Sequence, residues 1–146
     1  MIEFETEIPI NCTIEDVFSY MSQGEKFSRW NSAVKEVTKL TRGPDGIGTQ
    51  YRMIRDLPNG HAENTIEIIE YEPNQRFSIR TNDGPTPFKY QYSLRTEDNT
   101  VYVNLKSMIE EKGLPFRLPK FLASRAIKRG VDDNLRTLKS IIEASC

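Results

Sequence analysis

The stretch FKYQYSLR, Phe88 to Arg95, alternates apolar and polar side chains without a break. Successive side chains of a β-strand point to opposite faces, so this alternation predicts a strand with one dry face and one wet face. The dry face carries three aromatic rings, and two of them are tyrosines whose hydroxyl groups need partners when buried. The stretch therefore predicts a sheet whose inner face either packs as core or lines a cavity.

Strands of the same kind are expected before and after this stretch. The segments between them, such as DLPNG, EPNQ and TEDN, contain the Pro, Gly, Asn and Asp that tight turns require, and short turns connect antiparallel neighbours. SAVKEVTKL is the weakest of these strands and is expected at an edge of the sheet. The predicted strands are IEFETEIPI (2–10), SAVKEVTKL (32–40), TQYRMIR (49–55), HAENTIEIIEY (61–71), RFSIRT (76–81), FKYQYSLR (88–95) and TVYVNLKSMI (100–109).

Two short helices are predicted after the first strand. CTIEDVFSYM (12–21) has Thr13 as its N-cap, with Asp16 three residues later in an imperfect capping box. The second short helix covers residues 25–29.

One long helix is predicted from about Pro119 to Ala144, roughly 40 Å at ~1.5 Å per residue. Its apolar stripe has spacings of four, four, three and four residues and consists of Ile127, Val131, Leu135, Leu138 and Ile142. Nearer the start, the same face carries the small residues Ala123 and Ser124. Because one helix cannot fill a large curved sheet along its whole length, we expect a cavity where this face is small.

These elements predict an α+β helix-grip fold: a curved antiparallel sheet of about six or seven strands around a long C-terminal helix, with two short helices after the first strand. The chain of 146 residues is expected to form a single domain over 1–146. A hydrophobic content of 37% and a charged content of 28% indicate a globular protein, and no apolar run reaches the length of a spanning helix.

Charge and cysteine usage limit the partners and the compartment. The net charge of −1 predicts no nucleic-acid partner, and the acidic N-terminus argues against export. Cys12 and Cys146 are far apart in the sequence, which argues against a disulfide and favours a reducing cytoplasm. A single histidine with two separated cysteines forms no zinc pattern, so we expect neither a metal nor a cofactor.

The segments IPINCTIEDVFSYMSQGEKFSRWNSAVKEV, GIGTQYRMI and IEIIEYEPNQRFSIRT resemble the polyketide cyclase/dehydrase and lipid-transport family of the START-like (SRPBCC) superfamily. The resemblance covers nearly the whole chain and is strongest at Pro9 to Phe18, at Trp30, at Gly48-Thr49 and at YEPNQRF. It implies a helix-grip fold with a deep apolar cavity between sheet and helix. Members include ligand carriers, cyclases and quinone-binding respiratory chaperones, so the resemblance implies no catalytic residues.

Strand phase predicts which side chains face the long helix. They are Tyr51, Met53, Arg55, Asn64, Ile66, Ile68, Phe77, Ile79, Phe88, Tyr90, Tyr92, Leu94, Val101, Val103 and Leu105. The opposite, solvent-facing set is Gln50, Arg52, Glu63, Thr65, Glu67, Lys89, Gln91 and Lys106. A one-residue slip would reverse a strand, and the adjacent isoleucines of EIIEY are where we expect one.

The polar content of the inner face favours a cavity over a filled core, because buried polar atoms need partners and a small-molecule site combines rings with a few polar groups. The predicted ligand-binding residues are Trp30, Tyr51, Met53, Arg55, Asn64, Ile66, Phe77, Phe88, Tyr90, Tyr92, Val103, Ala123, Ser124 and Ile127. The catalytic residues are unknown.

Several of these positions keep a second interpretation. Arg55 is either a rim residue in water or a clamp for a ligand carboxylate or phosphate. Trp30 is either core or pocket wall. Ser124 and Lys120 either contact a ligand or face solvent, and His61, beside a turn, is either solvated or a general base.

The segment 112–129 mixes basic and large apolar residues. It is either an ordinary amphipathic helix start or a surface for transient contact with an anionic membrane.

Three functions compete for this sequence. The first is a cytoplasmic carrier or sensor of a hydrophobic small molecule, such as a lipid, polyketide or isoprenoid. The second is a cyclase or dehydratase that moves protons with pocket Tyr, Asn, Arg or His. The third is an interaction protein with a vestigial cavity. The absence of an evident acid–base pair on the inner face favours the first.

Overall fold

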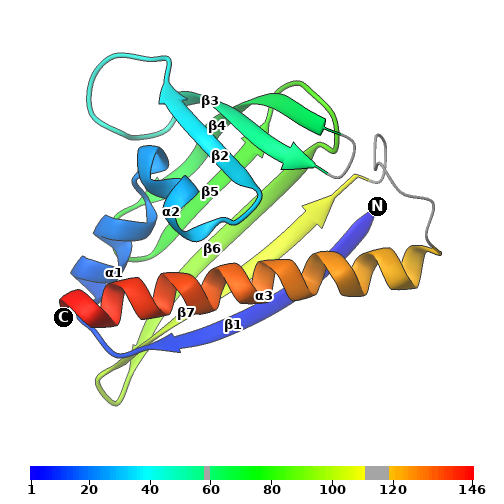
Figure 1. Cartoon of the computed structure of the whole chain (residues 1–146). Helices are drawn as coiled ribbons and strands as arrows, with labels where there is room; N and C mark the ends of the chain where they lie inside the picture. The colour runs from blue at the N-terminus through cyan, green and yellow to red at the C-terminus, as the bar shows by residue number, and fades with distance from the viewer. Residues whose placement is uncertain (58–59, 111–118) are drawn as a thin grey trace.

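The computed structural model describes residues 1–57, 60–110 and 119–146. Within these residues seven strands form one antiparallel sheet in the order β1-β7-β6-β5-β4-β3-β2, as Figure 1 shows. The strands are β1 (Ile2–Ile10), β2 (Val34–Lys39), β3 (Gln50–Leu57), β4 (Gly60–Glu72), β5 (Arg76–Thr81), β6 (Phe88–Glu97) and β7 (Thr100–Ile109). The predicted α+β architecture is confirmed, with β2 at an edge; the DLPNG turn lies partly outside the described residues.

The helices also match the sequence prediction. They are α1 (Ile14–Met21), the short 3₁₀ helix η1 (Gly24–Lys26), α2 (Phe27–Trp30) and α3 (Lys120–Ser145). Thr13 caps α1 by accepting a hydrogen bond from the backbone N–H of Asp16 at 3.2 Å. No helix among the described residues is long and apolar enough to cross a membrane.

Helix α3 lies along β1 and reaches α1 with its C-terminal end (Figure 1). Its buried side chains are Ala123, Val131, Leu135, Leu138 and Ile142, which include most of the predicted stripe. Beneath them the sheet contributes a ring cluster around Phe77, which stacks on Tyr92 with centroids 6.1 Å apart. Burial of these apolar and aromatic surfaces is the main force that holds the helix on the sheet.

The predicted inward set is buried except for Arg55 and Tyr90, which are half-buried, and the predicted outward set is exposed or half-buried. Tyr51, Asn64 and Phe77 are fully buried, whereas Arg52 and Glu63 are exposed. The pairing of β4 with β5 shifts between Ile68 and Glu70, where the slip was expected. Because this bulge comes after Ile68, the buried face of β4 keeps its phase up to that residue.

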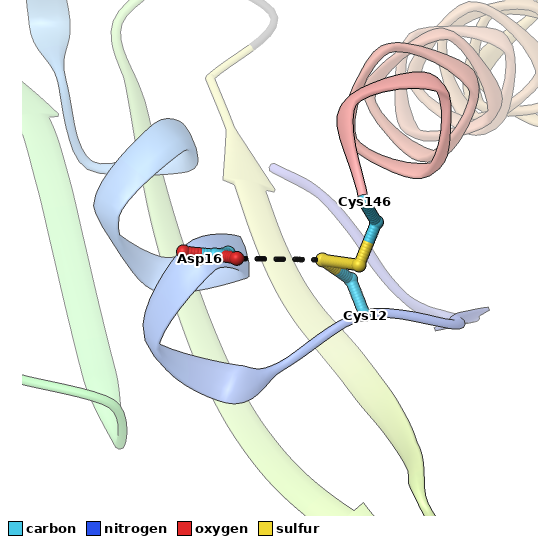
Figure 2. A group of neighbouring side chains, drawn as sticks. All are labelled: Cys12, Asp16 and Cys146. Carbon is cyan, nitrogen blue, oxygen red and sulfur yellow. Dashed lines mark hydrogen bonds between the residues drawn. A yellow bond between two sulfur atoms is a disulfide. The ribbon is translucent and has the colours of Figure 1, made fainter.

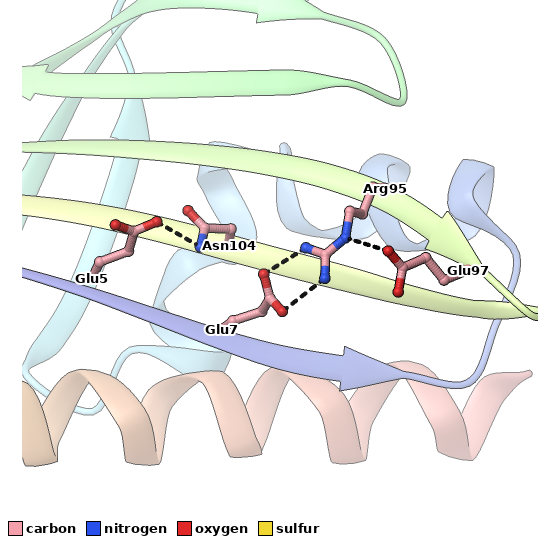
Figure 3. Close-up of polar contacts among 5 residues, drawn as sticks. All are labelled: Glu5, Glu7, Arg95, Glu97 and Asn104. Atoms are coloured by element: carbon pink, nitrogen blue, oxygen red, sulfur yellow. Dashed lines mark hydrogen bonds and ion pairs between the residues drawn. The ribbon is translucent and has the colours of Figure 1, made fainter.

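Polar side chains link three strands on the outer face of the sheet (Figure 3). Arg95 of β6 forms a two-pronged ion pair with Glu7 of β1, at 2.6 and 3.0 Å, and a further contact with Glu97 at 3.2 Å. Asn104 of β7 donates to Glu5 at 3.0 Å. The hydrogen bond from Arg95 lowers the pKa of Glu7 below its ordinary value.

The two cysteines form a disulfide, which corrects the expectation of unpaired thiols (Figure 2). Their Cα atoms are 5.7 Å apart although the residues are separated by 134 positions. The sequence separation was misleading because Cys12 comes two residues after β1 and Cys146 directly follows α3, and these two elements lie side by side. Structural disulfides form mainly in oxidising compartments. Because the two cysteines are paired, they no longer support a reducing cytoplasm.

Candidate ligand cavity

A cavity of about 90 Å³, partly open to solvent, lies between the inner face of the sheet and the helices. It is bounded by α2, the start of β2, β3, β5, β6 and the middle of α3. Its lining residues are Phe27, Trp30, Asn31, Ala33, Val34, Met53, Arg55, Ile79, Phe88, Tyr90, Tyr92 and Asn134. Strand alternation brings the sheet residues to this face, and the short helix α2 brings two further rings.

Aromatic rings form a continuous wall around this space. Phe27 and Trp30 meet edge to face at 5.8 Å, and Trp30 meets Tyr92 in the same way at 6.2 Å. Tyr92 continues to Tyr90 at 6.4 Å, and Tyr90 lies 4.5 Å from Phe88. Rings in such arrangements offer both apolar faces and polar edges to a bound molecule.

Arg55 is the one cation among the described residues that line the cavity. Its Nε and Nη2 donate to Oδ1 of the buried Asn64, at 3.0 and 2.6 Å, and Nη2 also donates to the Pro85 carbonyl at 2.8 Å. The guanidinium lies 5.5 Å from the centroid of the Phe88 ring. These contacts hold the charged group in place without neutralising it.

A second polar group fastens α3 to the connection between α2 and β2. Asn134 accepts a hydrogen bond from the Ser32 backbone N–H at 3.1 Å, and its amide nitrogen lies 3.4 Å from the Asn31 side-chain oxygen. Asn31 in turn donates to the Phe27 carbonyl at 2.9 Å. The cavity wall is therefore tied to the long helix by side-chain amides.

None of the described residues that line the cavity is Asp, Glu or His, so this part of the lining offers no acid–base pair. Burial raises the pKa of Tyr90 to about 12, an effect opposed by Arg55 and the Ser107 hydroxyl. Burial also raises the pKa of Tyr92 and lowers that of Arg55. At neutral pH both tyrosines therefore keep their protons, and Arg55 stays charged because an arginine has so high a pKa.

The predicted ligand-binding residues divide into two groups. Those that line the cavity are Trp30, Met53, Arg55, Phe88, Tyr90 and Tyr92. Those that lie outside its lining are Tyr51, Asn64, Ile66, Phe77, Val103, Ala123, Ser124 and Ile127. The role of either group in binding stays a prediction.

Packing explains why the second group lies elsewhere. The ring of Tyr51 is fully buried against Gly24, and its hydroxyl donates to Asp45 at 2.5 Å. Burial and this hydrogen bond raise the pKa of Tyr51. Ala123 is also buried but does not line the cavity, because among the described residues of α3 it is Asn134 that borders this space.

Several lining residues were absent from the predicted set. They are Phe27, Asn31, Ala33, Val34, Ile79 and Asn134. Asn134 had a readable signal, because it falls three residues after Val131 and four before Leu138, at the spacing of the buried stripe. Ile79 on β5 was predicted to face inward but was not counted as a ligand contact. Phe27, Asn31, Ala33 and Val34 lie on the very short helix α2, in the connection after it and at the start of β2, where periodicity carries little information.

Two other groups of titratable residues lie outside the cavity. Cys12, Asp16 and Cys146 place their ligand atoms within 4.8 Å of one another, but the two sulfurs are bonded to each other (Figure 2). A disulfide sulfur cannot serve as a thiolate ligand. His61 contacts Asp56 at 2.8 Å with both side chains exposed, as expected for a solvated histidine near a turn.

The described part of the basic segment 112–129 begins at Pro119, and 112–118 lie outside the described residues. At the start of α3, Phe121 is 64% exposed and Leu122 is 39% exposed. Arg125 and Arg129 are exposed on the next turns. Large apolar side chains and cations therefore share one surface there.

Residues 1–143 match the family described as polyketide cyclase / dehydrase and lipid transport. The chain belongs to this family. No curated protein matches the sequence. The polyketide cyclase/dehydrase assignment agrees with the helix-grip fold derived above.

Solved structures share the fold at low identity. A START superfamily protein from Mycobacterium smegmatis is 14% identical, with a TM-score of 0.82 and coverage of 99% of each chain. A protein from Thermus thermophilus is 16% identical, with a TM-score of 0.79 and coverage of 98% of each chain. The Zhui aromatase/cyclase from a Streptomyces species is 12% identical, with a TM-score of 0.73 over 97% of this chain and 93% of that one. At such identities the likeness concerns the fold alone.

Proposed function

We propose that this protein binds or carries a hydrophobic small molecule, of the lipid, polyketide or isoprenoid kind, without chemical turnover. The observation that carries the proposal is the ring-walled cavity whose lining contains no acid–base pair. Apolar rings with a few polar groups are the usual composition of a small-molecule site. The family's description supports the same class of ligand.

The size of the cavity limits which part of such a molecule it encloses. Sites for drug-sized ligands measure roughly 300–1,000 Å³, whereas this one measures about 90 Å³. That volume holds part of a ring or one branched end of a ligand. The remainder of a longer molecule lies at the open side of the cavity.

A cyclase or dehydratase that uses Tyr90, Asn134 or Arg55 is the alternative. A general base works best with a pKa near the operating pH. Burial raises the pKa of Tyr90 to about 12, which disfavours it as a base at neutral pH. The chemistry of the lining thus supports binding over catalysis.

A pair of substitutions tests the proposal. Tyr90 is a half-buried ring on the cavity, whereas Leu135 is 2% exposed in the core. Tyr90→Ala should stay folded and lose affinity for a fluorescent lipid probe. Leu135→Ala should lose about 2–5 kcal/mol of unfolding free energy, because it leaves a cavity in packed core.

The opposite pattern is informative as well. If the wild type binds no probe, and Tyr90→Ala destabilises the protein as much as Leu135→Ala does, the rings are ordinary core and the proposal fails. A native mass spectrum of the purified protein adds an independent reading, since a retained ligand appears as added mass.

Contact with an anionic membrane through 112–129 forms part of the proposal, because a carrier of a hydrophobic molecule must load it from somewhere. The exposed Phe121 and Leu122 beside Arg125 and Arg129 support it. Phe121→Ala/Leu122→Ala should weaken co-sedimentation with phosphatidylserine vesicles, whereas Leu40→Ala, an exposed leucine elsewhere, should not. Equal sedimentation of all three proteins would remove this part of the proposal.

A further inference from the structure

Arg55 differs from the paired arginines of the sheet because it has no anionic partner among the residues that the structure describes. Its hydrogen bonds go to two neutral oxygens, Asn64 Oδ1 and the Pro85 carbonyl. Among the described residues, no carboxylate forms an ion pair with it within 4.0 Å. Three other arginines of the sheet do have carboxylate partners, as Arg52–Glu63, Arg76–Glu70 and Arg95–Glu7.

Arg55 is half-buried, and even partial withdrawal of a charge from water is costly unless the charge is paired. Burial lowers the pKa of Arg55, yet the guanidinium stays protonated at neutral pH. The Phe88 ring at 5.5 Å offers only partial compensation. An uncompensated positive charge therefore stands at the wall of the cavity.

The position of Arg55 is fixed by its neighbours. Asn64 is fully buried, and its Nδ2 donates to the Asp83 carbonyl at 2.7 Å and the Pro85 carbonyl at 3.1 Å, which directs Oδ1 to the guanidinium. The Nη1 group has no hydrogen-bond acceptor among the described residues. A guanidinium held in this way is preorganised to receive an oxyanion.

The other polar groups of the lining complement the same kind of ligand. The indole Nε1 of Trp30 is buried and has no hydrogen-bond partner in the part of the chain that the structure describes. The hydroxyls of Tyr90 and Tyr92 keep their protons at neutral pH because burial raises both pKa values. Residues that carry donor groups, together with one cation, therefore line the cavity, and none of the described lining residues is Asp or Glu.

We propose that the ligand is a hydrophobic organic acid whose carboxylate pairs with Arg55 while its ring or branched body packs against the aromatic wall. This inference rests on the proposed function and names the chemical class of its ligand. The enclosed volume of about 90 Å³ selects a compact acidic end, such as a single-ring carboxylate. Engineered apolar cavities of roughly 150 Å³ hold one benzene molecule in other proteins, so a ring of that size must reach into the open side.

Benzoate and benzamide make a matched pair of probes, because they share a shape and differ in charge. Trp30 is the only tryptophan of the chain and lines the cavity, so quenching of its fluorescence reports binding directly. We expect benzoate to bind at least about tenfold more tightly than benzamide, the difference that a charged hydrogen bond makes. Arg55→Gln should abolish this preference, so that the benzoate-to-benzamide affinity ratio falls to about one.

Arg52→Gln is the control, since Arg52 lies on the same strand but faces solvent. It should keep the benzoate preference. If Arg55→Gln fails to fold, as judged by its circular dichroism, the benzoate-to-benzamide ratio of the wild type decides alone. Equal binding of the two probes, or binding of benzamide only, overturns the inference and leaves the proposed function standing. If neither probe binds, the inference fails, and the fluorescent lipid probe then decides the proposed function separately.

Discussion

Removal of the Cys12–Cys146 disulfide should destabilise the protein strongly. The cross-link closes a loop with a sequence separation of 134 residues, nearly the whole chain. In the chain-entropy account, a loop of that length restricts the unfolded state by about 5 kcal/mol, and measured effects are typically about 2–4 kcal/mol. Since domains of this kind have a total stability of roughly 5–15 kcal/mol, the double variant Cys12→Ser/Cys146→Ser should lose a large part of it.

Urea denaturation of the wild type, the double variant and the wild type with reductant measures this effect. The last two should coincide, with midpoints well below that of the oxidised protein. Their denaturant slope should also rise, because an unfolded chain without the cross-link exposes more surface. Ser145→Ala provides the control, since it alters the neighbouring exposed residue without touching the disulfide.

Two results would refute this reasoning. Thiol titration of the native, unreduced protein should detect no free thiol, and two thiols per chain would mean that the bond does not form. If the bond forms but its reduction leaves the urea midpoint unchanged, then contacts between the α3 and β1 segments must persist in the unfolded chain and confine it already. The cross-link would then have no effect on stability.

Two further predictions concern packing and pH. Gly24→Ala should lower the free energy of unfolding by about 1–3 kcal/mol, because an added Cβ would lie 2.4 Å from the buried Tyr51 ring. Gly46→Ala, whose added Cβ meets open space, should lower it far less, and thermal denaturation of both variants measures the difference. Glu143 should contribute stability at pH values above its ordinary pKa of 4.5 and lose it as the pH falls through its lowered folded value, because the backbone N–H of Asn11 stabilises its charged form. Stability measured from pH 6 to pH 3 should therefore fall less steeply in Glu143→Gln, and parallel curves would contradict this.

The sheet could be predicted from the sequence because the alternation of apolar and polar residues within each strand indicates which side chains face inward. FKYQYSLR alternates over its whole length, and the pairing that places Tyr92 opposite Leu105 keeps both inside. The stripe on α3 was readable for the same reason, since burial imposes a period on each element. Neither signal depends on knowing which distant element covers it.

The cavity was predictable only in part because its lining depends on how elements meet. Alternation indicated that Tyr90 and Arg55 point inward, but it could not reveal that Arg55 would find neutral acceptors and no carboxylate. Small residues on α3 suggested a space beside Ala123, but the cavity borders α3 at Asn134, eleven residues farther along. Single-sequence patterns do not distinguish a gap from a close approach.

The disulfide was not predicted for a related reason, because sequence separation does not show which elements lie side by side. The geometry of β1 and α3 explains why Cys12 and Cys146 meet. Thr6 donates to Asp132 at 2.7 Å, and the Asn11 backbone N–H donates to Glu143 at 2.8 Å, so β1 and α3 run in the same direction. Five strand residues advance about 17 Å, and eleven helical residues advance about 16.5 Å. The two elements therefore advance by equal distances between these two contacts. Cys12 comes one residue after Asn11, and Cys146 comes about one helical turn after Glu143, so the two cysteines lie beside each other. Two cysteines at the ends of elements that keep this register meet however many residues separate them.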